Sequence, residues 1–131
     1  MPRYALIKHY RGVPADFPPM STWTADDVRA HVDYMDRFAD KLRASGEFVD
    51  SLALSEEAEL ITADGSTRAV PASKALVAGW MLIDVPTARR ARELAAELAA
   101  APGKDGVPLR EWLELRPAYG APMADDEGET G

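Results

Sequence analysis

The hydrophobic pattern changes its period along the chain, and each change predicts a different element. Residues Tyr4 to Tyr10 alternate loosely between apolar and polar side chains, which favours a strand. A stripe with helical spacing follows, formed by Val28, Val32, Met35, Phe38, Ala39 and Leu42. The charged residues between these positions are expected to face water: Arg29, Asp33, Asp36, Arg37, Asp40 and Lys41. Thr24 and Asp27 form a capping box and Gly46 is a stop signal, so we expect a helix from about Ala25 to Gly46.

The middle of the chain reads as strands and a hairpin. Phe48 to Leu54 predicts a second strand. Glu59 to Ala69 predicts a short hairpin outside the main sheet, because Ala63-Asp64-Gly65-Ser66 supplies the turn residues. Val77 to Val85 is the most apolar run and suits a central strand that helices cover on at least one face.

A second helix and a last strand complete the pattern. Thr87 can cap a helix from Ala88 to about Ala101. Its inward residues are expected to be Ala91, Leu94, Ala95 and Leu98, while its charged residues, among them Glu97, stay in water. Glu111 to Arg116 predicts the final strand. From Gly120 the chain is small and acidic, so we expect one domain over residues 1–119 and a disordered acidic tail over 120–131.

The predicted order of elements is β-α-β followed by β-α-β, with the hairpin between the halves. This order is typical of an α+β, ferredoxin-like split βαβ sheet with both helices on one face. The other face carries some apolar residues and requires a cover. A second copy packed face to face is the economical cover, and we therefore expect a homodimer.

Composition excludes several classes of function. The chain has 131 residues, a formal net charge of -7 and no run of Lys or Arg, which argues against a nucleic-acid surface. The absence of Cys excludes disulfides, thiolate metal sites and a Cys nucleophile, and two His leave little for zinc. We find neither a membrane-spanning apolar stretch nor a signal-peptide pattern, so the expected location is the cytoplasm. No phosphate-binding loop or nucleophile elbow is present, and we expect no cofactor.

Short motifs distributed along the chain resemble those of a known family. The residues concerned are Tyr4-Ala5-Leu6-Ile7, His31, Tyr34, Leu42-Arg43-Ala44-Ser45-Gly46, Ser73-Lys74, Ala78-Gly79-Trp80-Met81-Leu82-Ile83-Asp84-Val85 and Glu114-Leu115-Arg116-Pro117. On these residues the chain up to Pro117 resembles the YCII-related family, including its DGPF branch. The resemblance implies a ferredoxin-like fold that dimerises sheet to sheet into an α-β barrel.

The same resemblance implies a polar site that this chain carries only in part. The family's helix histidine, viewed there as one half of an acid-base pair with an aspartate, corresponds to His31. Counting back from Trp80, the Asp-Gly-Pro-Phe motif falls at Thr67-Arg68-Ala69-Val70, so Thr67 replaces the aspartate. Ala72 stands in place of a family glutamate, and only Lys74 is kept from this segment.

Each candidate site residue has a functional and a structural interpretation. His31 lies beside the apolar stripe, where it is either a proton carrier or a half-buried histidine bonded to a backbone carbonyl or a partner. Tyr34 either offers its hydroxyl to a ligand or packs, and Lys74 either binds an anionic group or is solvated. Trp80 and Trp112 can floor a pocket, but a core or dimer interface is the first interpretation.

Three readings of function remain open at this stage. The leading hypothesis is a small dimeric protein that binds an apolar or mildly polar molecule in a cleft between the first helix and the sheet. The rival is a cofactor-free enzyme in which His31 is general acid or base and Lys74 or Thr67 positions the substrate. A third reading is an interaction module with no pocket. A metal site of His9, His31 and Asp50 is a weak alternative, because these residues lack local ligand spacing.

Overall fold

A computed structural model describes residues 1–124 except for residues 10–21, 56, 71–76 and 109–112. Its elements, in chain order, are β1 (Arg3–His9), α1 (Ala25–Ser45), β2 (Phe48–Ala53), β3 (Ala58–Ile61), β4 (Thr67–Val70), β5 (Val77–Asp84), α2 (Ala88–Ala99), the 3-10 turn η3 (Lys104–Gly106) and β6 (Leu113–Pro117). Two helices combined with antiparallel strands confirm the predicted α+β class. Neither helix of the described chain is long and apolar enough to cross a membrane.

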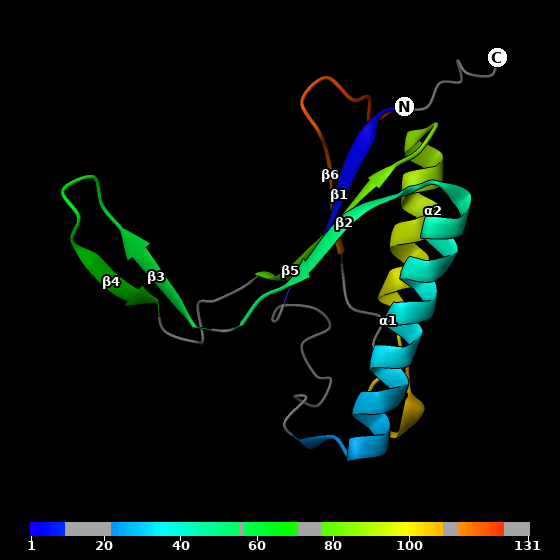
Figure 1. The fold of residues 1–131 in the computed structure, drawn as a ribbon, viewed down its shortest axis with the longest axis horizontal. Helices are drawn as coiled ribbons and strands as arrows, with labels where there is room; N and C mark the ends of the chain where they lie inside the picture. Colours follow the sequence, from blue (N-terminus) through cyan, green and yellow to red (C-terminus); the bar gives the residue numbers. More distant parts are fainter. Residues whose placement is uncertain (10–21, 56, 71–76, 109–112, 125–131) are drawn as a thin grey trace.

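Four strands form the main sheet in the order β2-β5-β1-β6, and each neighbouring pair is antiparallel. Both helices lie along the same side of this sheet (Figure 1). β3 and β4 form a separate two-stranded sheet, so the prediction of a hairpin outside the main sheet is confirmed. The final strand is found at Leu113–Pro117, and positions 109–112, which include Trp112, lie outside the described residues.

The core lies between the sheet and the two helices. On the central strands, Tyr4 pairs with Ile83 and Leu6 with Met81, so these four side chains share the face that the helices cover. The helices complete the core with Phe38, Ala39, Leu42, Ala88, Ala91, Leu94 and Leu98. The inward residues predicted for the second helix therefore pack as expected, with Ala95 at the margin of the core.

β2 and β5 approach each other closely at Gly79. A Cβ atom added there would lie 2.7 Å from the carbonyl oxygen of Leu52, which is closer than real side chains come. Glycine is therefore needed at this point of the sheet. Gly46 has a different role: it ends α1 in the left-handed conformation, with φ of 82°.

Helix α1 begins and ends where its capping signals predict. The Thr24 hydroxyl accepts a hydrogen bond from the Asp27 amide and the Asp27 carboxylate accepts one from the Thr24 amide, both at 3.0 Å. The inward face differs from the prediction at one position. Val32 is 47% exposed, and His31 is buried instead because it lies directly in line with Phe38 and Leu42 on the packed face.

The first residues of the expected tail are held against the body. The Pro122 carbonyl accepts a hydrogen bond from the Tyr4 hydroxyl. The Met123 carbonyl accepts one from Arg92, and Ala121 packs against the core. These bonds use main-chain carbonyls, which every residue type supplies. Residues 125–131 of the predicted tail lie outside the described residues.

A buried carboxylate links the start of β2 to α2. Glu47 is only 7% exposed, and its two oxygens accept hydrogen bonds from the Arg90 guanidinium at 2.8 and 3.0 Å. The Ser45 hydroxyl donates a third bond at 2.7 Å. The bonds from Arg90, more than the bond from Ser45, hold the pKa of Glu47 below its ordinary value of 4.5.

Replacing Glu47 with Gln should lower the free energy of unfolding by about 2 kcal/mol at pH 7, because buried hydrogen bonds to a charged group are lost. The folded-state pKa of Glu47 lies below 4.5. The stabilisation is therefore complete above that pH and is lost as the pH falls through the folded-state pKa, where wild type and variant converge. Urea unfolding at pH 7 and at successively lower pH measures both effects.

Glu93→Gln is the matched control. The Glu93 carboxylate is 59% exposed and meets the same Arg90 at 3.4 Å, so its loss should change stability by less than about 0.5 kcal/mol. Equal effects of the two variants would contradict a special role for Glu47.

Candidate functional site

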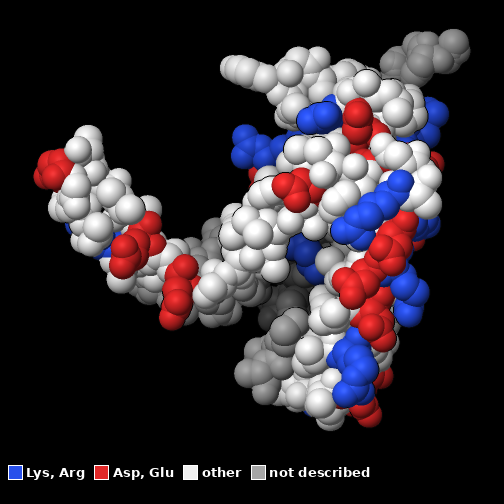
Figure 2. Space-filling view, in the orientation of Figure 1, with Lys and Arg blue, Asp and Glu red and all other residues white. Residues whose placement is uncertain are grey.

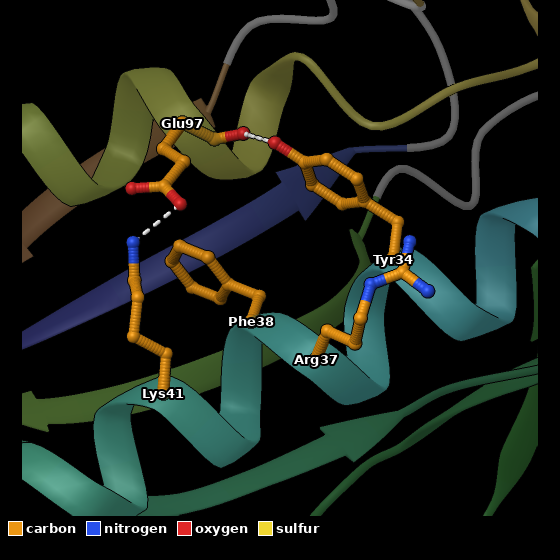
Figure 3. Close-up of a pocket in the computed structure, with 5 residues that line it drawn as sticks. All are labelled: Tyr34, Arg37, Phe38, Lys41 and Glu97. Carbon is orange, nitrogen blue, oxygen red and sulfur yellow. Dashed lines mark hydrogen bonds and ion pairs between the residues drawn. The ribbon is translucent and has the colours of Figure 1, made fainter.

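A hollow of about 230 Å³ lies between the two helices. It is lined by Tyr34, Arg37, Phe38 and Lys41 of α1 and by Glu97 of α2 (Figure 3). Tyr34 lies three and four positions before Arg37 and Phe38, and Lys41 lies four and three positions after them, which brings the four residues to one side of the helix. The hollow is thus formed between the helices, whereas the sequence analysis expects a cleft between the first helix and the sheet.

Glu97 of α2 bonds to a residue of α1 at each end of the hollow. The Tyr34 hydroxyl donates a hydrogen bond to the Glu97 main-chain carbonyl at 2.7 Å. The Lys41 ammonium forms an ion pair with the Glu97 carboxylate at 2.5 Å. Figure 3 shows these two side chains reaching α2 on either side of the Phe38 ring. The spacing of the helices at this point is therefore set by polar bridges, and Phe38 supplies an apolar wall between them.

The two cations that line the hollow differ in whether they are paired within the described chain. Lys41 is used in its ion pair with Glu97 and also lies 5.6 Å from the centre of the Phe38 ring. Arg37 is exposed and forms no ion pair or hydrogen bond within the part of the chain that the structure describes. Its planar guanidinium, which can bind a carboxylate or carbonyl through two N–H groups, is therefore available to a ligand.

Tyr34 remains a neutral donor at ordinary pH. Burial raises its pKa above the usual 10.0, and the nearby Glu97 carboxylate raises it further. Its proton is directed at the Glu97 carbonyl, so the hydroxyl oxygen keeps its lone pairs for a second partner in the hollow.

His31 belongs to a different cluster, at the start of α1. Its Nδ1 lies 2.9 Å from the Pro102 carbonyl oxygen, to which it must donate a proton, and its ring meets the Trp23 ring edge-on at 5.5 Å. The side chain is only 8% exposed. This arrangement is the structural alternative of the sequence analysis, a histidine bonded to a backbone carbonyl.

Two more hydrogen bonds join the loop after α2 to the start of α1. The Asp27 carboxylate accepts from the Asp105 amide at 3.0 Å, and the Lys104 ammonium donates to the Thr22 carbonyl at 2.9 Å. The backbone bond from Thr24, ahead of that from Asp105, lowers the pKa of Asp27. His31 is thus one of several residues that fasten the loop after α2 to the first turns of α1.

The other predicted site residues lie apart from this helix. Thr67 is the first residue of β4, exposed on the hairpin. Trp80 is half-buried on β5, on the face of the sheet away from the helices, where it pairs with Ile7 and Leu52. Lys74 lies outside the described residues. Of the predicted residues that the structure describes, only His31 and Tyr34 share an element, and they bind different partners.

His9 and His31 also have separate environments. His9 Nε2 lies 2.9 Å from a carboxylate oxygen of Glu114, across β1 and β6. His31 packs at the helix layer, as described above. Among the residues that the structure describes, no three of the His, Asp and Glu side chains gather closely enough to hold a metal ion.

Sequence reasoning missed Arg37, Lys41 and Glu97 as lining residues, because it assigned all three to water. The signal was present in part: Tyr34, Arg37 and Lys41 form one row on α1. Whether this row lines a hollow depends on which face of α2 lies opposite, and local spacing along α1 does not contain that information.

Comparison with protein-family models gives no match, and a search of curated proteins finds no relative.

Replacing Tyr34 with Phe removes the hydroxyl bridge to Glu97 and leaves the ring. We expect the free energy of unfolding to fall by about 1 kcal/mol, the usual net value of one such hydrogen bond. Urea unfolding measures the loss. Tyr119→Phe is the control, since Tyr119 is fully exposed and its variant should match wild type. If Tyr34→Phe also matches wild type, the bridge does not hold the helices together.

Proposed function

We propose that this chain forms a homodimer that binds a small organic molecule in the hollow beside α1. The observation that carries the proposal is Arg37, a cation without a partner in the described chain, at the edge of a hollow that Glu97 braces open. An unpaired guanidinium beside a buried ring is suited to a molecule with both a polar and an apolar part.

The hollow limits the class of ligand. Its volume of about 230 Å³ lies below the range typical of drug-sized ligands, roughly 300–1,000 Å³. Phe38 accommodates an apolar body, while the Arg37 guanidinium, which only donates, faces an acceptor group. The ligand class is therefore a small carboxylic acid or ketone. One small acid needs only a local positive group, so the overall charge of -7 does not oppose it.

The proposal includes the fold type and family suggested by the sequence. The strand order β2-β5-β1-β6, with both helices on one side, supports a ferredoxin-like arrangement and, with it, a YCII-related origin. The face away from the helices supports the dimer, because Leu52, Trp80 and Ile7 lie side by side across three strands there. Leu52 is 51% exposed. A second copy packed on this row would remove it from water.

Arg37→Gln should weaken binding of a small carboxylic acid about tenfold, because one charge-assisted interaction is lost, and should affect a ketone less. Titrations of the dimer with short aliphatic and aromatic acids and their ketone analogues, followed by amide shifts in residues 34–41, measure these affinities.

Arg29→Gln provides the control on the same helix. Arg29 is exposed, pairs with Asp26 and does not line the hollow, so its variant should bind like wild type. Equal weakening by both variants would mean that only general surface charge attracts the acids, and would contradict the proposed site.

The rival proposal of a cofactor-free enzyme is favoured by one detail of His31. Its Nδ1 donates to the Pro102 carbonyl, and this hydrogen bond selects the tautomer in which Nε2 is the basic nitrogen of the ring, as a general base requires. The low exposure of His31 restricts access to that atom, which is why binding is the leading proposal.

Wild-type protein incubated with the same acids and ketones should give no turnover if binding is its function. Product formation that is lost in His31→Ala and also in His31→Gln would establish the enzyme instead. The glutamine variant keeps a side-chain N–H for Pro102, and circular dichroism of both variants shows whether lost turnover reflects lost folding.

A further inference from the structure

The charges that line the hollow between the helices do not balance. Arg37 and Lys41 supply two cations, whereas Glu97 is the only acid among the described residues that line it. One positive charge is therefore left over around a hollow of about 230 Å³. In a space of this size the position of each charged group affects which ligands can bind.

The two cations are not equally accessible to a ligand. The Lys41 ammonium already lies 2.5 Å from the Glu97 carboxylate. Figure 3 shows this pair on one side of the Phe38 ring and the Arg37 guanidinium on the other side, next to Tyr34. A carboxylate that enters beside Arg37 meets a cation with no counter-ion in the described chain. A carboxylate beside Lys41 has to compete with Glu97.

Arg37 also differs from the other arginines of α1. Arg29 pairs with Asp26 at 2.5 Å, and Arg43 pairs with Asp40 at 2.9 Å. Figure 2 shows Lys and Arg side chains interspersed with Asp and Glu along the side of the molecule where α1 lies. At physiological salt, exposed charges farther apart than about 8 Å are largely screened from each other. The charge of a ligand is therefore selected by the groups at the hollow itself.

The Glu97 carboxylate acts on the hollow as well as on Lys41. After burial, it is the next largest cause that raises the pKa of Tyr34, and Lys41 opposes it. Tyr34 and Lys41 lie on opposite sides of the Phe38 ring, so the negative charge of Glu97 is felt across the hollow (Figure 3). A second carboxylate on a ligand would meet the same charge.

An acid with two carboxylates is thus at a disadvantage in this hollow. With one group on Arg37, its other group would have to separate Lys41 from Glu97 or remain near Glu97 without a counter-ion. Both arrangements cost binding free energy, because a charge loses water or its partner without full replacement. An acid with a single carboxylate has neither cost.

We propose that Glu97 is the residue that selects the charge of the ligand. By pairing with Lys41 it leaves Arg37 as the anchoring cation, so the hollow favours acids with one carboxylate over acids with two. The inference rests on the proposed binding of small acids beside α1 and adds the residue that discriminates among them.

Glu97→Gln tests this role, because it removes the carboxylate and keeps the main-chain carbonyl that Tyr34 binds. Wild type should bind butanoate more tightly than butanedioate, and hexanoate more tightly than hexanedioate, at a pH where every carboxyl group is ionised. In the variant, the affinity for each diacid relative to its monoacid should rise about tenfold, because Lys41 becomes free to bind the second carboxylate. Titrations of the full-length protein, followed by amide shifts in residues 34–41, measure these affinities.

Two further variants make the test specific. Lys41→Gln added to Glu97→Gln should return the affinity ratio to the wild-type value, because the freed cation is removed. Glu93→Gln makes the same change of charge one turn earlier on α2, where the side chain pairs with Arg90 and does not line the hollow. Its affinity ratio should match that of wild type.

The outcomes separate this inference from the proposed binding site. A rise in the diacid ratio that depends on Lys41 and is absent in Glu93→Gln supports the role of Glu97. An unchanged ratio in Glu97→Gln, an equal rise in Glu93→Gln, or a rise that persists without Lys41 overturns that role, while binding of monoacids through Arg37 still stands. A wild-type protein that binds neither class of acid overturns both.

Discussion

The pairing of β1 with β5 at the centre of the sheet is the constraint on which the other features depend. Its register aligns Tyr4 with Ile83 and Leu6 with Met81, and this places four large side chains on one face. The helices cover that face, and their charged residues are left at its outer surface. Because side chains alternate along a strand, the same register sends Ile7 and Trp80 to the opposite face. A slip of one residue would exchange the two faces.

The two helices are also held in place by polar side-chain bonds at the outer side of the helix layer. Glu47 with Arg90 and Glu97 with Tyr34 and Lys41 join α2 to the α1–β2 half of the chain at two heights. The first bridge is buried and strengthens the fold. The second lies at the surface, where it borders the hollow. Arg37, which lines the same hollow, has no hydrogen bond or ion pair within the described chain. Stability and the proposed binding site thus use the same kind of interaction at different depths.

The sequence predicts most of the fold because its signals are local. The capping box at Thr24, the stop at Gly46 and the turn at Asp64 and Gly65 each act within four residues, and all are found where expected. The burial of His31 in place of Val32 was missed, because Val32 was assigned to the apolar stripe, whereas His31 lies in line with Phe38 and Leu42 and contacts Trp23 and Pro102.

The site is less predictable for the same physical reason. Arg37, Lys41 and Glu97 read as solvated charges until α2 is placed beside α1, and Glu47 reads as a surface residue until Arg90 reaches it across the chain. The family resemblance points to His31, Thr67 and Trp80, which lie on the helix layer, the β3–β4 hairpin and the open sheet face respectively. Assembling distant residues requires tertiary information that spacing along one chain does not carry.

The position of β1 has a consequence for synthesis. β1 is made before both of its partners, β5, which ends at Asp84, and β6, which ends at Pro117. It therefore stays an unpaired apolar segment while the residues between them are made. Its alternation with Lys8 and His9 keeps it partly polar during that interval. Completion of the sheet therefore has to wait until β6 has been made.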